Sequence, residues 1–297
     1  MIDSRSNTIP EHKPVMVSEV VSCLLTDLNG IYVDGTIGLG GHSLEILSIL
    51  NRNGHVIGID RDIDAVSKSK TMLSQQYPNC SIFNGSYANV DTFLAEFGVK
   101  TVNGILLDLG LSSAQLNNKN RGFTYNGVGT LDMRFNQQSR KTAAEILASS
   151  SESEIADFIY KYSEERFSRK IAYNIKKADK METVDDLIEA IRKSTPPNKR
   201  NRSKARVFQA IRIIVNDELA HLELFLGKFT SLLCEGGRIV IMSYHSLEDR
   251  LVKIAFKKLN AESKLLILTK RPIIATSDEI IQNSRAKSAK LRAGERI

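Results

Sequence analysis

Short hydrophobic runs rich in β-branched residues alternate with amphipathic segments through the first third of the chain. The hydrophobic runs are residues 31–34, 55–60, 81–83 and 104–108. Each has the length and apolar character of a buried strand in a parallel sheet. The segments with helical spacing of apolar residues are 43–51, 63–76 and 90–97. This alternation predicts a doubly wound α/β fold around a mostly parallel sheet.

The alternation stops between residues 115 and 216, where no run typical of a strand occurs. The segments with helical spacing there are 142–148, 151–162, 166–178, 183–193 and 205–216. Two of them begin with capping boxes, Ser151-x-x-Glu154 and Thr183-x-x-Asp186. Strand-like sequence returns at 236–243 and 265–268, on either side of a helical segment. We therefore predict a core domain of residues 1–114 and 217–297, interrupted by an inserted all-helical domain of residues 115–216.

A glycine-rich turn follows the first predicted strand, with the sequence Asp34-Gly-Thr-Ile-Gly-Leu-Gly-Gly-His42. Glycines permit positive φ angles and close approach of a ligand to the backbone, so the turn is either a nucleotide-binding loop or a tight structural turn. The dinucleotide pattern G-x-G-x-x-G fails, because the sixth position counted from Gly38 is Ser43. A P-loop is excluded, since no Gly-Lys-Ser/Thr follows the turn.

Three of the predicted strands end in an acid, namely Asp34, Asp60 and Asp108. The carboxyl ends of parallel strands meet at one edge of the sheet, where open α/β sheets bind ligands. A carboxylate there repels a pyrophosphate and tolerates a cation, and Asp60 stands where an acid accepts hydrogen bonds from ribose hydroxyls. Each acid alone is equally explained as a helix cap. Together with the glycine turn, they predict a cationic nucleoside ligand, S-adenosylmethionine.

These motifs resemble those of a known family, the bacterial ribosomal RNA small subunit methyltransferase H family, which makes N4-methylcytidine in 16S ribosomal RNA. The matching stretches run nearly end to end. They are His12-x-Pro14-Val15, the glycine turn 34–43, Ile59-Asp60-Arg61-Asp62, 106–116, Arg121-Gly122-Phe123, Leu131-Asp132-Met133-Arg134, Glu164-Glu165-Arg166-Phe167, Phe208-Gln209-Ala210-x-Arg212 and 243–250. Segments 201–207 and 283–288 keep positive charge but depart from the family pattern.

The resemblance implies a class I methyltransferase fold with an inserted helical domain, S-adenosylmethionine as cofactor and ribosomal RNA as substrate. It also implies a set of cofactor-binding residues, with Asp60 on the ribose and Tyr87 beside the adenine. The set is Gly40, Gly41, His42, Asp60, Tyr87, Asp108 and Gln115.

Two residues are candidates for catalysis of methyl transfer to the cytidine amine. Asp108, at a strand end beside the methyl donor, is expected either to accept a hydrogen bond from the amine or to orient the cofactor. His245 follows the strand-like run 236–243, and a neutral imidazole accepts protons. The alternative for His245 is a structural one, in which it packs the turn through hydrogen bonds with Ser246 or Glu248.

The composition is that of an ordinary globular protein, with 42% hydrophobic and 25% charged residues. No segment has the length of apolar sequence that a membrane span needs, and the polar N-terminus is unlike a signal peptide, so we expect a cytoplasmic protein. Cys23, Cys80 and Cys234 stand far apart, which favours reduced thiols, and the five histidines show no spacing typical of a metal site.

The net charge of +7 suits a phosphate-rich partner, although a merely soluble basic protein has the same charge. Five cations fall within residues 199–206, and a second group comprises Lys287, Lys290, Arg292 and Arg296. We expect both groups to contact RNA phosphates, the alternative being a solvated face. The target base must be unstacked or flipped out to expose its amine.

The rival interpretations are a nicotinamide-dependent oxidoreductase, against which the failed glycine pattern argues, and a non-catalytic RNA-binding protein. The sequence leaves open the oligomeric state, a homodimer included, and whether naked RNA or the assembled small subunit is the substrate.

Overall fold

The computed structural model describes residues 14–125, 129–138 and 141–297, which leaves His12 of the first family motif outside the described residues. The chain divides into two compact units. The first, here called the sheet unit, is residues 1–110 and 223–297, and the second, the helical unit, is residues 111–222. The boundaries expected from sequence lie a few residues away from these. α11 (Glu218–Leu226) crosses the second boundary.

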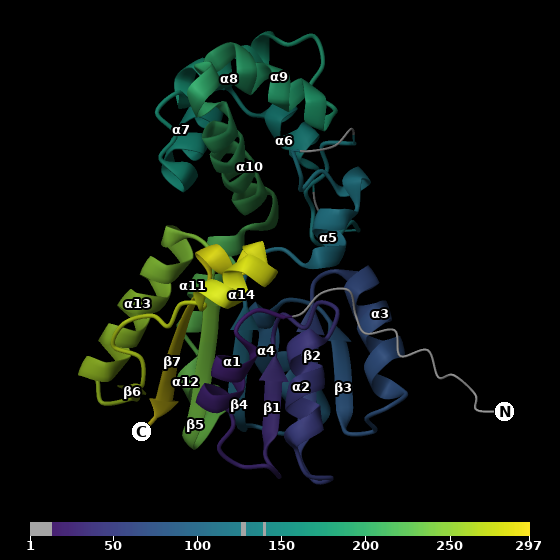
Figure 1. Ribbon diagram of the computed structural model, residues 1–297, viewed down its shortest axis with the longest axis vertical. Coiled ribbons are helices and arrows are strands. Elements are labelled where there is room, and N and C mark those ends of the chain that lie inside the picture. The colour runs from purple at the N-terminus through teal and green to yellow at the C-terminus, as the bar shows by residue number, and fades with distance from the viewer. Residues whose placement is uncertain (1–13, 126–128, 139–140) are drawn as a thin grey trace, which may run out of the picture. The chain divides into compact units, whose positions relative to one another are not determined.

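A seven-stranded sheet runs through the sheet unit in the order β3-β2-β1-β4-β5-β7-β6 (Figure 1). The strands are β1 (Ile31–Asp34), β2 (His55–Asp60), β3 (Cys80–Asn84), β4 (Val102–Asp108), β5 (Leu233–Ser243), β6 (Leu265–Ile267) and β7 (Lys290–Arg296). The first five are parallel to one another, and β7 pairs antiparallel with both β5 and β6. The predicted doubly wound, mostly parallel sheet is confirmed.

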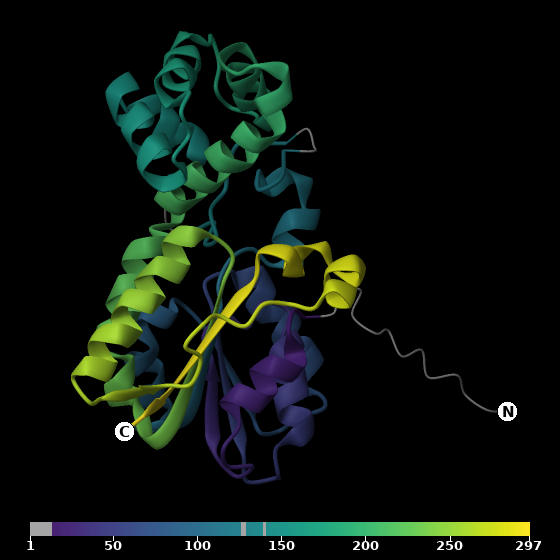
Figure 2. The same ribbon diagram turned by 60° about the vertical axis from the view of Figure 1, so that its left-hand side comes forward.

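β7, the gold strand beside β5 in Figure 2, was not predicted, because charged residues alternate with its apolar ones. Leu291 and Ala293 are buried in the core, while Lys290 and Arg292 point the other way and pair with the carboxylate of Asp249. Arg296 donates to the carbonyl of Leu233. These three cations of the second basic group therefore each have a partner within the sheet unit, and their contact with RNA stays a prediction.

Helices flank the strands of the sheet unit. They are α1 (Val17–Leu24), α2 (Gly41–Ile49), α3 (Ile63–Ser74), α4 (Val90–Phe97), α12 (Phe229–Leu232), α13 (Ser246–Ala261) and α14 (Ser277–Gln282), with the short 3-10 turns η1 (Tyr87–Asn89) and η4 (Ser284–Ser288). The ring of Phe229 packs against those of Phe225 and Phe256, which joins α11, α12 and α13. The sheet thus has the helical cover that a buried parallel sheet needs.

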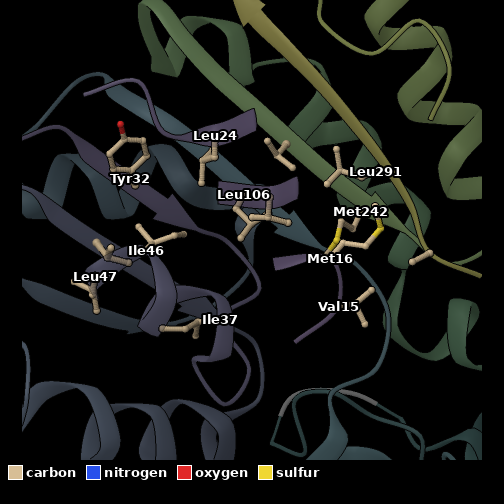
Figure 3. Close-up of a cluster of buried hydrophobic side chains, with 14 of the residues drawn as sticks. Val15, Met16, Leu24, Tyr32, Ile37, Ile46, Leu47, Leu106, Met242 and Leu291 are labelled. Atoms are coloured by element: carbon tan, nitrogen blue, oxygen red, sulfur yellow. The ribbon is translucent and has the colours of Figure 1, made fainter. Parts of the chain in front are cut away.

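One hydrophobic cluster joins α1, α2 and α3 to one face of the sheet (Figure 3). Leu24 and Ile46 come from the helices, while Tyr32, Leu106 and Met242 come from three different strands. Side chains in a strand alternate between faces, so Ile105 and Leu107, both fully buried, point to the opposite face. The sheet is buried on both faces, and this is why its strands read as continuous hydrophobic runs.

The helical unit contains α5 (Ser113–Asn117), α6 (Ala143–Ser149), α7 (Glu152–Ser163), α8 (Ser168–Lys177), α9 (Val184–Ser194) and α10 (Arg200–Asn216), with 3-10 turns η2 (Lys119–Arg121) and η3 (Pro197–Lys199). Its own core is built around α10, whose Val207, Phe208 and Ile211 cluster with residues of α6 to α9. In the described part of this unit only an isolated bridge, Thr130 with Thr183, has β character.

The predicted capping boxes are present at Ser151 and Thr183, and each N-cap hydroxyl accepts a bond from the backbone three residues on. Such caps contribute about 1 kcal/mol each. Across the described residues no helix combines the length and apolar character needed to cross a bilayer.

The three cysteines are free thiols, as predicted, and each is partly buried. Burial raises the pKa of the Cys80 thiol to about 12. Cys80 is therefore protonated at neutral pH and inert as a nucleophile.

Leu106→Ala should destabilise the protein by about 3 kcal/mol, because it removes a fully buried side chain from β4 and leaves a cavity. The measurement is the free energy of unfolding in urea. Leu266→Ala is the matched control, since Leu266 is 47% exposed on β6 and its truncation should cost well under 1 kcal/mol. Equal losses for the two variants would contradict the placement of the core.

Candidate active site

The three acids predicted to share one edge of the sheet do so. Asp34, Asp60 and Asp108 are the last residues of β1, β2 and β4. β1 lies between the other two strands and is parallel to both, so the three strand ends are neighbours. Repulsion from Asp34 is among the effects that raise the pKa of Asp60, as expected for carboxylates gathered at one place.

Asp60 is held by the glycine turn. Its Oδ2 accepts a hydrogen bond from the N–H of Gly38 at 2.8 Å, and its Oδ1 accepts one from the N–H of Asp62 at 2.9 Å. Burial raises its pKa to about 6, despite these two bonds, which favour the charged form. Each oxygen keeps a further lone pair, so the carboxylate can still accept hydrogen bonds from a ligand.

Asp34 has a different role from the one expected for a carboxylate facing a cation. Its side chain is only 2% exposed, and its Oδ2 accepts a hydrogen bond from the hydroxyl of Ser43 at 2.7 Å. Its Oδ1 accepts from the N–H of Thr36 at 3.2 Å. Burial raises its pKa. Asp34 therefore fastens the end of β1 to the first turn of α2, underneath the glycine turn.

The turn needs glycine for conformation and for packing. Gly38 and Gly40 have φ angles of 52° and 82°. A Cβ at Gly40 would come within 2.8 Å of Leu73 of α3. Gly40 is also the N-cap of α2 and offers no side chain to the helix, so the first-turn amides, including those of Gly41 and His42, are left for other acceptors. A helix start of this kind attracts negative groups.

His42 and Tyr244 both lie against Asp108, whose side chain is 27% exposed. The Tyr244 hydroxyl donates to Asp108 Oδ1 at 2.7 Å, and His42 Nε2 lies 3.5 Å from Oδ2. Burial would lower the pKa of His42, but Asp108 and Asp34 outweigh it and hold the pKa above its usual value. Burial, followed by the nearby charge of Asp108, raises the pKa of Tyr244 well above its usual value.

Two predicted cofactor residues use their side chains for local structure. Tyr87 is 9% exposed, packs edge-on against Phe225 with ring centroids 5.7 Å apart, and lies beside Gly35. Gln115 belongs to the helical unit, where its Oε1 accepts from the N–H of Ser112 at 3.0 Å in a capping box. The structure gathers Gly40, Gly41, His42, Asp60, Tyr87 and Asp108 in the sheet unit.

His245 is the N-cap of α13 and forms a capping box with Glu248. Its Nδ1 accepts from the Glu248 N–H at 3.4 Å, and its Nε2 lies 3.1 Å from Glu248 Oε1. A neutral imidazole has one lone pair, and the cap uses it. This geometry favours the structural alternative over a proton acceptor.

Other family motifs also have structural roles in the helical unit. The Arg121 guanidinium donates to the carbonyls of Arg134 and Phe135, which ties two motifs together. Gln209 donates to the Tyr162 carbonyl at 3.1 Å, and Arg212 makes two hydrogen bonds with Glu218. These side chains stabilise the helical unit through hydrogen bonds within it.

Sequence reasoning missed the partners of the acids. Ser43 was noted only because it breaks the dinucleotide pattern, and Tyr244 only as part of the matching stretch 243–250. The Ser-x-x-Gln pattern of a capping box could have revealed the local role of Gln115. No local signal joins Tyr244 to Asp108, because they are 136 residues apart.

This strand order, with β7 antiparallel beside β5 and acids at the tips of β1 and β2, defines a class I methyltransferase. The particular family follows from comparison with known proteins. The chain belongs to the MraW methylase family, whose model matches residues 10–297.

The chain is 44% identical over 291 residues to ribosomal RNA small subunit methyltransferase H of Thermosipho africanus, covering 97% of this chain and 98% of that one. It is 43% identical over 291 residues to the protein of the same name from Kosmotoga olearia, covering 96% and 97%. A solved structure described as a putative rRNA methylase from Clostridium thermocellum aligns over 95% of both chains with a TM-score of 0.47 and 13% identity.

His245→Ala should lower the free energy of unfolding by about 1 kcal/mol, because it removes the cap of α13, while His245→Asn should retain most of the stability, since asparagine is a good N-cap. Thermal unfolding and the methyl-transfer rate are measured for both variants. If His245 acts only as the N-cap, the Asn variant should also keep the methyl-transfer rate of the wild type. If His245 were the proton acceptor, both variants would lose turnover together.

Proposed function

We propose that this protein transfers a methyl group from S-adenosylmethionine to the exocyclic N4 amine of a cytidine in small-subunit (16S) ribosomal RNA. The observation that carries the proposal is the group of three acids at adjacent strand ends around the glycine turn, in a chain of the MraW methylase family. The substrate class is the one that the names of the relatives give, and these relatives match almost the whole chain.

The residues present fit the methyl donor. Asp60 is partly exposed and keeps lone pairs for ribose hydroxyls. The first-turn amides of α2 at Gly41 and His42, after the N-cap Gly40, suit a carboxylate, and the acidic edge suits a sulfonium and an ammonium group. For Tyr87 a place beside the adenine, and for Gln115 a cofactor contact, are further parts of the proposal.

When bound, S-adenosylmethionine supplies a methyl group whose bond to sulfur breaks with the electron pair returning to sulfur. The cytosine amine is a poor nucleophile, because its lone pair is delocalised into the ring. We assign Asp108 to accept a hydrogen bond from the amine, which localises that lone pair, and then to take the released proton. Tyr244 engages Oδ1, so Oδ2 on the side of His42 is the oxygen for this task.

His245 is the second catalytic candidate. To take a proton it would have to give up the hydrogen bond from the Glu248 N–H to its Nδ1. Asp108 needs no such rearrangement, because it is accessible in the structure as it stands. The geometry therefore favours Asp108.

The proposed RNA contacts lie on the helical unit, where Arg202 of the basic run 199–206 is exposed. Because the amine must be reached outside a base pair, we expect the substrate to present the cytidine unstacked, and we propose the assembled small subunit as its form. A cytoplasmic location follows from that substrate.

Deletion of the gene should remove one N4-methylcytidine from small-subunit RNA, measured by base-level mass spectrometry. The wild-type gene should restore the modification. RNA that carries the same modifications with and without the gene would overturn the proposal.

Asp108→Asn should slow methyl transfer by on the order of 100-fold, because it removes the proton acceptor. The affinity of this variant for S-adenosylhomocysteine, measured by calorimetry, should change far less.

Affinity for S-adenosylhomocysteine should fall as pH drops through about 6, the pKa of Asp60. The carboxyl is ionised above this pH and is then the stronger acceptor for ribose hydroxyls, so binding is full above it and weakens below it, by up to about tenfold per pH unit. Calorimetric titrations across this range measure the effect.

His42 also has a shifted pKa, raised above its usual value by Asp108 and Asp34, so Asp60→Asn is needed to isolate the contribution of Asp60. The Asn variant should bind more weakly at neutral pH and lose the part of the pH dependence that Asp60 causes. An identical pH profile in both proteins would rule out an Asp60 contact with the ribose.

A further inference from the structure

A polar cavity of about 410 Å³ lies at the C-terminal end of α7, within the helical unit. It is lined by Tyr160, Lys161, Glu164, Arg166 and Arg206. The volume is within the range of ligand sites in proteins. We propose that this cavity, here called the α7 pocket, binds a backbone phosphate of single-stranded RNA, with the adjacent base stacked on Tyr160. Only the identity of that RNA as ribosomal rests on the proposed function.

The wall of the α7 pocket is built by contacts between α10 and the end of α7. Glu164 adopts a left-handed conformation with φ 51°, which turns the chain out of the helix. Arg206 donates to the Glu164 carbonyl at 3.4 Å, and Gln209 donates to the Tyr162 carbonyl at 3.1 Å. The next residue, Glu165, is buried and accepts the Phe167 N–H at 3.0 Å. The backbone around the cavity is therefore held in place.

The charges of the α7 pocket favour an anion. Three cationic side chains line it against a single carboxylate, that of Glu164. Arg206 lies 3.8 Å from the buried Glu165, so part of its charge is compensated. Lys161 and Arg166 are exposed, and Lys161 lies 5.1 Å from the centroid of the Tyr162 ring. A guanidinium matches the geometry of phosphate oxygens, so arginine is the residue expected at a phosphate site.

Tyr160 indicates that the anion belongs to a nucleic acid strand. Its side chain is 59% exposed on the rim of the cavity, although an aromatic ring is usually more buried. Bases of single strands stack on exposed aromatic rings regardless of sequence, whereas paired bases are already stacked. A cationic pocket beside such a ring suits a phosphate and its neighbouring base. An acidic peptide would use the cations and leave the ring unused.

The α7 pocket also extends the basic run 199–206, because Arg206 belongs to both. α10 thus carries cations from its N-terminus to the pocket. A single strand of RNA bound along α10 would reach the α7 pocket without contacting the sheet unit. The pocket therefore explains why the cations of α10 and the exposed tyrosine of α7 occur together.

The test uses the full-length protein and a short, unstructured, fluorescein-labelled pyrimidine RNA, with affinity measured by fluorescence anisotropy over a range of KCl concentrations. The variant Tyr160→Ala/Arg166→Gln should bind about 10-fold or more weakly, because it lacks the stacking platform and one of the cations that bind phosphate. The salt dependence should also fall, by about 0.7 in the logarithmic slope for each phosphate that the variant no longer neutralises. Tyr160→Phe should keep the affinity of the wild type, since it keeps the ring.

A matched control exists on α8, where Lys177 lies 5.6 Å from the ring centroid of Tyr173, a side chain 48% exposed and outside the pocket. Tyr173→Ala/Lys177→Gln removes the same kinds of group and should bind RNA like the wild type. Equal loss of affinity in both double variants would overturn the proposal, as would competition by poly-glutamate as effective as that by unlabelled RNA. Circular dichroism melting verifies that both variants fold.

The binding test needs no methyl donor. If the pocket variant loses RNA binding while the wild type does not methylate ribosomal RNA, the RNA site at the α7 pocket is supported and only the proposed function is contradicted. If the pocket variant binds RNA normally and the wild type methylates ribosomal RNA, the proposed function is supported and the RNA site at the α7 pocket is contradicted.

Discussion

The buried carboxyl of Asp34 is the constraint on which the site depends. It ends β1 in the interior, accepts hydrogen bonds from the hydroxyl of Ser43 and the N–H of Thr36, and so joins the strand to the helix across the glycine turn. Within the glycine turn, the N–H of Gly38 donates a hydrogen bond to Asp60, and the hydroxyl of Thr36 accepts one from the backbone N–H of Asp108. One buried acid thus sets the positions of two more accessible ones, at the cost of a raised pKa for its own side chain.

Family motifs in this chain mix two kinds of residue. Asp60 and Asp108 have lone pairs and access left for a ligand, whereas His245, Gln115 and Arg121 use their polar groups for caps and loop carbonyls. A motif match does not separate the two kinds, because substitution of the first would impair ligand binding and substitution of the second would impair stability. Hydrogen-bond partners and exposure do separate them.

The two units divide these tasks. The sheet unit gathers the acids at one edge and buries the strands that carry them. The helical unit has its own core around α10, so it can hold a rigid surface without support from the sheet. The cations that the sequence analysis assigned to RNA binding differ in the same way. Lys290 and Arg292 pair with Asp249 inside the sheet unit, while Arg202 is exposed on the helical unit.

Local pattern alone determined the doubly wound sheet, the helical insert, the caps at Ser151 and Thr183, and the acids at the strand ends, because hydrophobic period and capping act between residues close in the chain. It missed β7, where paired charges interrupt the apolar pattern. Only the tertiary structure decided that Asp34 is buried, that Tyr244 donates a hydrogen bond to Asp108, and that residues of α7 and α10 line one pocket. These features depend on the register and depth at which distant elements meet, and no short stretch of sequence encodes that.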